Sequence, residues 1–401
     1  MQPPPTAAEP PQRIPEEVLR SPVPTFLPPA VFVGPDLFNP PAPQGWLSLT
    51  PSFTLSGGYD DNIFLRSRNV RSDEIIGFTP GVTVAVQRPS YRLLAGYNVS
   101  GELYLENSNL SNFARSQNLF ADAIYDLSPS VRLMFSDQFV YSQDSNVLTS
   151  SGASIGRETA WRNTASPRVR WQVTPNTALN LVASHTILQF EKSDDQDSNT
   201  YRIGAGAEHR LTPRLTGYLD MSVGYLDVRR DPSVWTYTPT LGLSYDVTKT
   251  LRASLSGGPT IVETSGDTRV FPAISAGLTQ TFKFGYVQAG YNRAVTAETL
   301  GASDTQTFFG SVVVSTLVRG LQLGFTPRYS IVDSDLSDRF RNSSDVKVFT
   351  LNLGATYQIA RNISVIGSYT FFQQRSDVSN SDIDQNRVFL GLQYAFPINF
   401  Y

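Results

Sequence analysis

The chain has 401 residues and a formal net charge of −3, with 17% charged and 11% aromatic residues and no cysteine. The nearly balanced charge gives no reason to expect nucleic acid as a partner, and the lack of cysteine excludes disulfides and thiolate metal sites. No apolar run reaches the roughly 18 residues that a spanning helix requires, which excludes a helical membrane protein. We predict that the protein uses no cofactor and no metal ion.

Residues 1–45 form a proline-rich segment that holds more than half of the 27 prolines in the chain. Proline cannot donate to a sheet and favours extended polyproline conformers. We therefore predict an extended N-terminal region, with a plug folded back into the protein and a partner-docking peptide as alternatives. The start Met1-Gln2-Pro3 lacks the basic and apolar regions of a signal peptide. We interpret the chain as a mature exported protein with a replacement start or a trimmed end.

From residue 46 onward, apolar residues alternate with polar or small ones. Leu93, Ala95 and Tyr97 share one parity, for example, and Arg92 and Asn98 share the other. A β-strand sends alternate side chains to opposite faces, and a membrane barrel needs an apolar outside and a polar inside. The alternating segments are 46–64, 73–88, 91–107, 116–128, 131–145, 161–174, 177–191, 199–213, 215–229, 234–248, 250–264, 268–284, 286–299, 304–318, 321–335, 345–360, 362–376 and 386–401. We predict an all-β fold, a transmembrane antiparallel up-and-down β-barrel of about 18 strands, over residues 46–401.

The connections between these segments alternate in length. Tight turns such as Arg88-Pro89-Ser90 alternate with longer polar loops such as Ser145–Ala160. Bacterial barrels have an even number of strands, short turns in the periplasm and long loops outside, so residues 1–45 become a periplasmic extension and both termini are predicted to be periplasmic. Ser145–Ala160 is the longest loop, and we expect it to be too short to fold inward and constrict the pore, which favours a monomer.

The first strand leads into Asp60-Asp61-Asn62-Ile63-Phe64, and Pro80-Gly81 interrupts the second strand. In these features residues 46–401 resemble a family of β-barrel porins encoded with bacterial exopolysaccharide biosynthesis and export clusters. The resemblance implies a Gram-negative outer-membrane pore that passes an exopolysaccharide in concert with a periplasmic export apparatus. The alternatives are a general or solute-specific diffusion porin, and a structural barrel that anchors an assembly through its N-terminal tail.

The last segment is typical of the closing strand of an outer-membrane barrel. Small Gly391 alternates with outward Tyr394 and Phe396, and the chain stops at the aromatic Tyr401. The partners expected of such a protein are outer-membrane lipids, lipopolysaccharide and the barrel assembly machinery. The lumen is expected to hold polysaccharide or small solutes.

By parity, the lumen receives arginines near the periplasmic strand ends together with several carboxylates. These candidates for selectivity are Arg92, Arg132, Arg168, Arg170, Arg210 and Arg252, and Glu102, Glu208 and Asp220. Arginine presents planar, permanently charged donors that suit carboxylates and sulfates on acidic sugars. A basic vestibule would favour anions. Alternatively, the arginines pair with the carboxylates and form the mixed lining of any water-filled barrel.

Aromatic residues fall on both faces of the predicted strands. Outward Tyr97 and Trp171 are typical of the girdles at membrane interfaces. Inward Tyr104, Phe120 and Tyr218 either stack on sugars or pack the lumen wall.

The chain has two histidines, His185 and His209, and both fall on the outward parity. A hydrolase or acyltransferase would need a histidine beside a nucleophile, and neither has an obvious serine partner. We predict that the protein is not an enzyme.

Overall fold

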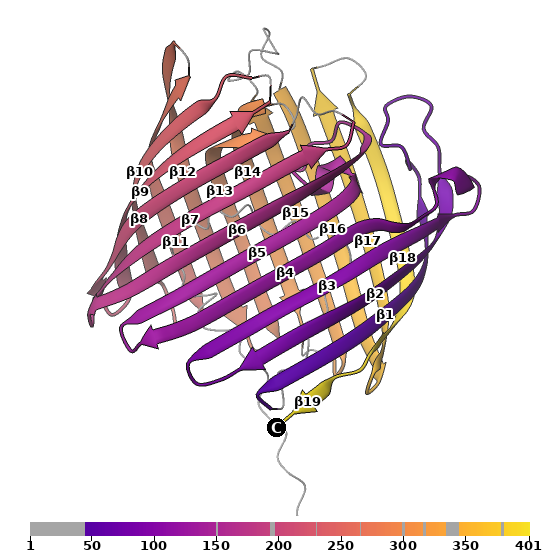
Figure 1. Cartoon of the computed structure of the whole chain (residues 1–401), viewed down its shortest axis with the longest axis horizontal. Coiled ribbons are helices and arrows are strands. Elements are labelled where there is room, and N and C mark those ends of the chain that lie inside the picture. The colour runs from indigo at the N-terminus through magenta and orange to yellow at the C-terminus, as the bar shows by residue number, and fades with distance from the viewer. Residues whose placement is uncertain are drawn as a thin grey trace, which may run out of the picture.

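The computed structural model describes residues 45–149, 151–192, 197–229, 231–264, 266–298, 301–315, 318–333, 345–377 and 381–401. They form one closed antiparallel β-barrel (Figure 1), which confirms the predicted all-β up-and-down fold. The proline-rich region predicted over residues 1–45 lies outside the described residues, apart from Gly45, and its role stays a prediction.

The wall consists of β1 to β18, extended at the C-terminus by a short strand β19. In chain order the strands are β1 (Leu47–Asp60), β2 (Asp73–Gln87), β3 (Tyr91–Tyr104), β4 (Asn112–Ser128), β5 (Val131–Asp144), β6 (Arg157–Thr174), β7 (Thr177–Phe190), β8 (Ser198–Thr212), β9 (Leu215–Val228), β10 (Val234–Asp246), β11 (Leu251–Thr264), β12 (Asp267–Phe282), β13 (Gly285–Glu298), β14 (Gly301–Val314), β15 (Leu321–Asp333), β16 (Asp345–Ala360), β17 (Ile363–Ser376), β18 (Ile383–Ala395) and β19 (Ile398–Phe400). Two short 3-10 helices, η1 (Ser108–Leu110) and η2 (Ser145–Val147), lie in connections. Within the described ranges, no helix is long and apolar enough to cross a membrane.

The last strands close the barrel on the first. In β1, Ser52 pairs with Ala395 of β18, and Asp60 pairs with Arg387 of the same strand. Nearer the start of β1, Leu47 pairs with Phe400 of β19. Figure 1 shows the yellow β18 beside the indigo β1.

The final strand differs from the prediction of one segment over 386–401. It begins earlier, at Ile383, and is interrupted between Ala395 and Ile398. Pro397 lies in the gap and has no N–H for the ladder. The remaining residues therefore pair separately, as β19.

The aromatic residues of the closing segment are exposed. Tyr394 and Phe396 keep nearly half of their surface exposed, and Tyr401 at the end of the chain keeps more. Gly391 allows a close approach at the seam, because a Cβ atom there would lie 2.6 Å from the carbonyl oxygen of Leu55.

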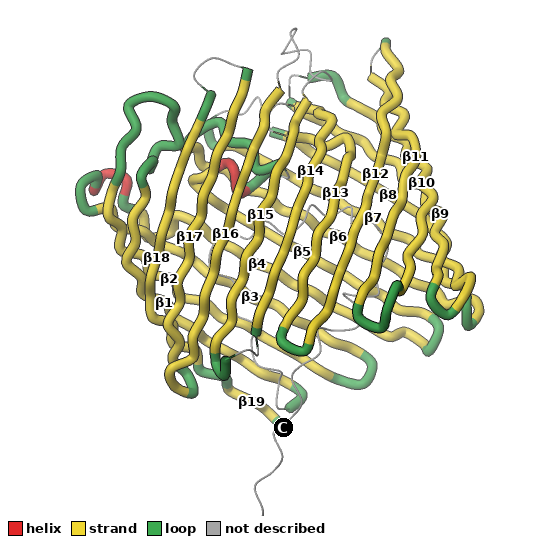
Figure 2. Tube along the Cα trace, turned by 180° about the vertical axis from the view of Figure 1, so that it is seen from behind, coloured by secondary structure: helices red, strands yellow, loops and turns green. Residues whose placement is uncertain are grey.

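The two ends of the barrel carry different connections, as the alternation of loop lengths predicts. Most connections after the even-numbered strands are tight turns, at the end here called the turn end, and most connections at the other end, here called the loop end, are longer (Figure 2). The exceptions at the loop end are the short connections of the β11–β12 and β13–β14 hairpins. The C-terminus lies at the turn end (Figure 1).

Side chains alternate between the outer surface and the interior. Large apolar residues stand outward, and Leu241 and Leu255 keep 67% and 62% of their surface exposed. Many inward residues are polar and buried, including Thr54, Thr236 and Thr240. The outside of the barrel is therefore more apolar than its lining, the reverse of a soluble protein.

The aromatic residues that the parity places outward do lie outward. Exposed aromatic side chains on the wall include Tyr97, Tyr125, Trp171, Tyr245 and Tyr357. Trp171 and Tyr245 lie near the turn ends of β6 and β10, and Trp235 lies at the loop end of β10.

Candidate functional site

A segment between β5 and β6 enters the lumen at the loop end. It comprises residues 145–156, of which residue 150 is outside the described part, and is called the lumen loop below. Ser145 has no exposed surface, and Leu148 and Ala153 are 1% and 2% exposed. The expectation that Ser145–Ala160 is too short to fold inward is therefore wrong.

The first half of the lumen loop packs on the inner side of β5, β6 and β7. Leu148 forms a buried apolar cluster with Val140, Ala160, Leu188 and Phe190. Burial of a leucine of this kind contributes about 2 kcal/mol. This contact anchors the loop to the wall from which it emerges.

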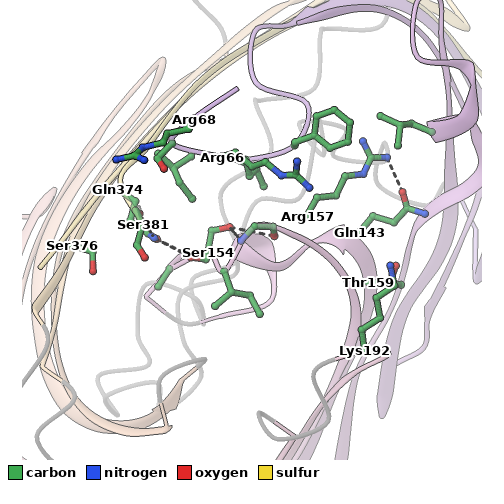
Figure 3. A pocket seen from close by; sticks show the side chains of 18 of the residues that line it. Arg66, Arg68, Gln143, Ser154, Arg157, Thr159, Lys192, Gln374, Ser376 and Ser381 are labelled. Carbon is green, nitrogen blue, oxygen red and sulfur yellow. Dashed lines mark hydrogen bonds between the residues drawn. The ribbon is translucent and has the colours of Figure 1, made fainter. Parts of the chain in front are cut away.

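The second half crosses to another part of the wall. Ala153 joins a cluster with Val346, Val348 and Phe372, on β16 and β17. The Ser154 N–H donates to Oε1 of Gln374 at 2.8 Å, and the Gln374 side-chain amide donates to the Ser154 carbonyl at 2.9 Å. The lumen loop thus bridges β5–β7 and β16–β17, and Figure 3 shows Ser154 facing Gln374.

The composition of the lumen loop explains how it lies in the interior without β-pairing. Buried backbone groups need partners, and serine side chains supply several of them. The hydroxyl of Ser145 donates to the Gly156 carbonyl at 2.9 Å, and Ser151 accepts from the Ala153 N–H at 3.1 Å. Gly156 has a φ of +103°, which suits glycine.

The end of the β13–β14 hairpin narrows the loop end from another side. Beyond Arg293, β13 no longer pairs with β12. Val295 and Ala302 of the hairpin join a buried cluster with residues of the inner side of β9, β10 and β11, namely Leu226, Val234 and Val262. The passage at this level is therefore smaller than the full circle of strands.

A basic pocket of about 860 Å³ adjoins the lumen loop. Its charged lining residues are Arg66, Arg68, Arg157 and Lys192, and no aspartate or glutamate of the described part of the chain lines it. Figure 3 shows Arg66 and Arg157 on the side of the loop away from Gln374. Several positive charges gathered in a partly enclosed space attract anions.

Arg157 is held in place by its neighbours. It donates to the Gln143 side chain at 2.8 Å, to the Ile63 carbonyl at 3.2 Å and to the Tyr104 hydroxyl at 3.3 Å. Arg66 instead stacks on the ring of Phe64, with its guanidinium carbon 4.9 Å from the ring centre. The pocket thus combines one fixed guanidinium with three cations on exposed side chains.

A buried cluster of charges, called the seam cluster, supports this pocket where the barrel closes. Arg387 of β18 contacts Asp60 of β1 at 3.1 Å, Glu102 of β3 at 2.6 Å and Asp144 of β5 at 3.5 Å. Arg115 of β4 pairs with Glu102 at 2.7 Å and also with Asp144. Asp144 directly precedes the lumen loop, so the cluster fixes its base to the seam.

The signature Asp60-Asp61-Asn62 belongs to the same seam. Asp61 accepts from the backbone and side-chain amides of Asn386, each at 2.7 Å. The Asn62 side chain donates to the carbonyls of Arg66 and Asp384 at 2.9 and 2.8 Å. Asn62 also ends β1, since its N–H donates to the Asp60 side chain at 2.9 Å; the strand predicted over 46–64 therefore stops at Asp60.

A second space, of about 160 Å³, lies between Leu148 of the lumen loop and the opposite wall. Its lining is rich in threonine and includes the arginines Arg162, Arg202, Arg293 and Arg328. Arg293 pairs with Asp304 at 2.6 Å, and Arg162 donates to the Leu148 carbonyl at 3.2 Å. The narrow part of the lumen is thus polar and carries further cations.

The arginines predicted for the lumen lie inward, near the turn end. Ion pairs join Arg132 to Asp126 at 2.6 Å, Arg170 to Glu208 at 2.5 Å and Arg252 to Asp246 at 2.7 Å. The remaining predicted arginines, Arg92, Arg168 and Arg210, share the inward parity of these positions. Their role in selectivity stays a prediction.

The predicted carboxylates divide between the two ends. Glu208 lies beside Arg170, and Asp220 packs over Gly206, where a Cβ atom would meet its Oδ1 atom. Glu102 instead lies in the seam cluster at the loop end. Parity alone groups Glu102 with the arginines at the turn end, but the structure places it at the other end of the barrel, beside Arg115 and Arg387.

Inward aromatic residues pack in the wall. Tyr104 and Tyr218 are 2% and 7% exposed, and the ring of Phe120 covers Gly96. Tyr104 donates from its hydroxyl to Glu102 at 2.8 Å. These contacts favour lumen packing over stacking on sugars.

Both histidines lie on the outer surface. His209 hydrogen-bonds Thr177 at 2.9 Å, and His185 stacks on Tyr201 with 4.3 Å between ring centres. Among the described residues, no cluster of acidic or histidine side chains is arranged to hold a metal ion.

Comparison with known proteins gives similarity of structure alone. No model of a known protein family and no curated protein matches the sequence. The crystal structure of Pseudomonas aeruginosa OccK9 (OpdG) is 12% identical, with 88% of this chain and 100% of that chain covered at a TM-score of 0.45. Pseudomonas aeruginosa OpdO is 16% identical, with 88% and 97% covered at 0.45. The alcaligin outer-membrane receptor FauA of Bordetella pertussis is 13% identical, with 87% and 76% covered at 0.35.

Proposed function

We propose that the barrel spans a bacterial outer membrane, with lipid and lipopolysaccharide around its outer surface. Trp161 and Trp171 of β6 are ten residues apart, as are Trp235 and Tyr245 of β10. At about 3.3 Å per residue and a tilt of about 40°, each pair spans a height of about 25 Å, which matches the apolar band of such barrels. The exposed Leu241 and Leu243 of β10 lie between Trp235 and Tyr245.

We further propose that the protein is a narrowed channel for small anionic solutes, a solute porin rather than a wide tunnel. The observation that carries this proposal is the lumen loop, which bridges the wall beside a pocket lined by Arg66, Arg68, Arg157 and Lys192. A cationic mouth concentrates anions, and the polar constriction beyond it selects small hydrated solutes.

Passage of an exopolysaccharide has no comparable support. It rests on the resemblance of the opening signature, and Asp60, Asp61 and Asn62 all bond to residues of β18 where the barrel closes. The lumen loop also narrows the path that a polymer would thread.

Neutralising the pocket tests the proposed selectivity. In planar bilayers the wild-type protein is expected to conduct anions better than cations and to be blocked by small dicarboxylates at lower concentration than by neutral oligosaccharides. Arg66→Gln combined with Arg68→Gln is expected to lower the anion-to-cation permeability ratio several-fold, because two of the four pocket cations are lost.

Arg269→Gln is the matched control. Arg269 also lies at the loop end and is half-exposed beside Asp267, but it does not line the pocket. This variant is expected to keep the wild-type ratio. Equal ratios for all three proteins would contradict an anion-selective pocket.

A further inference from the structure

The outer surface of β5, β6 and β7 carries polar side chains in the middle of the apolar belt. Asp137 of β5 lies between the outward Phe135 and Phe139, and it accepts from the side-chain amide of Asn163 at 3.2 Å. His185 of β7 is also outward, stacked on Tyr201. We call Asp137, Asn163, Ala165 and His185 the β5–β7 patch.

Strand pairing fixes the height of this patch. Ala165 of β6 pairs with Asp137 on one side and with His185 on the other. It lies four residues from Trp161 and six from Trp171, the aromatic residues of its own strand. Asp137 and His185 therefore lie midway between the two interfaces, where a barrel normally presents apolar side chains to lipid.

The polar atoms of the patch are incompletely paired. A carboxylate can accept about four hydrogen bonds. In the described part of the chain the carboxylate of Asp137 accepts from one donor, the side-chain Nδ2 of Asn163, which lies 3.2 Å from Oδ1 and 3.3 Å from Oδ2. The Nε2 atom of His185 is covered by its own chain and has no hydrogen-bond partner among the described residues, whereas the side chain as a whole is only half-buried and remains accessible to a second copy. Ionisable groups at this depth usually face a protein partner and not lipid.

The patch is complementary to itself. Asp137 lies on one side of Ala165 and His185 lies on the other. A two-fold axis that passes near Ala165 therefore places Asp137 of one copy opposite His185 of the next. Outward alanines at 121, 165 and 183 allow close approach, as small residues do in membrane interfaces. Other parts of the wall differ, because Leu241 of β10, Leu255 of β11 and Leu390 of β18 project into the surroundings there.

We propose that the β5–β7 patch is the contact between two copies of this chain in the membrane. The inference rests on the proposed placement of the barrel in a membrane and goes beyond its function as a channel. It replaces the expectation of a monomer, which depended on a loop too short to enter the lumen.

Single cysteines test the contact cleanly, because the chain has no cysteine of its own. Ala165→Cys is treated with a short bifunctional maleimide in isolated outer membranes. A covalent dimer is expected as the main product. Leu255→Cys, on the exposed face of β11, is the matched control and is expected to stay monomeric.

Adding Asp137→Leu and His185→Leu to Ala165→Cys is expected to abolish the dimer, although a lipid-facing leucine suits a barrel. Absence of the dimer with Ala165→Cys, equal cross-linking of both single variants, or a dimer that survives the leucine changes would each overturn the proposal. Conductance of the untreated Ala165→Cys protein is recorded in parallel. If no dimer forms but the anion-selective current is retained, the dimer proposal is overturned and the proposed channel function is not.

Discussion

Replacement of Arg387 by methionine is expected to lower the free energy of unfolding of the barrel by about 3–5 kcal/mol, the usual result of removing one partner from a buried ionic group. Arg387 contacts the carboxylates of Asp60, Glu102 and Asp144. Asp60 is 1% exposed, and Arg387 is the one cation among the described residues that forms an ion pair with its carboxylate. Equilibrium urea unfolding of the protein refolded into lipid vesicles measures the change.

Arg375→Met provides the comparison. Arg375 of β17 also pairs with an aspartate, Asp384, at 2.9 Å, but the two side chains keep 43% and 54% of their surface exposed. Exposed pairs contribute about 0–1 kcal/mol, so this variant is expected to unfold nearly as the wild type does. Similar losses in both variants would show that the seam cluster does not stabilise the closure.

Removal of the lumen loop is expected to raise single-channel conductance several-fold. Asp144 and Arg157 are cross-strand partners, so an Asn-Gly turn in place of residues 145–156 can join β5 to β6 directly. The strands remain, whereas the bridge to Gln374 is lost. Planar-bilayer recordings, together with uptake of larger neutral sugars into vesicles, report the wider passage.

A milder change separates the bridge from the bulk of the loop. Gln374→Leu removes both hydrogen bonds to Ser154 and is expected to give intermediate, fluctuating conductance. Gln373→Leu alters the neighbouring outward side chain, which bonds Asp384, and is expected to leave the current unchanged. A loop-deleted barrel with wild-type conductance would mean that the constriction lies elsewhere.

The strands of this fold are predictable because each obeys a local rule. The outward parity of Leu93, Ala95 and Tyr97 follows from the two-residue repeat, and prolines mark the turns after β2 and β4. The interrupted end of the wall is also local in origin, since Pro397 cannot donate. Such features need no knowledge of distant partners.

The site depends on contacts between residues far apart in the chain. A segment rich in serine and glycine predicts a solvated loop. The inward path of the lumen loop depends instead on Gln374, which is 220 residues from Ser154 in the chain. Arg387 has the inward parity of a lumen residue, but its partners follow from the closure of β18 on β1. Asp144, an inward charge at the loop end of β5, was an available signal. Arg115 shares the parity of the outward Phe113 and Leu119, and it is buried where the pairing of β3 with β4 is irregular.

The seam cluster also bears on the order in which the chain can assemble. Asp60 belongs to the first strand and is synthesised early. Its cross-strand partner Arg387 belongs to β18 and is synthesised near the end of the chain. A chain cut short before β18 would keep the carboxylates of β1, β3 and β5 without that cation. Such a fragment cannot bury them at low cost, so completion of the ring is coupled to synthesis of the whole chain, and unfinished barrels remain open to water.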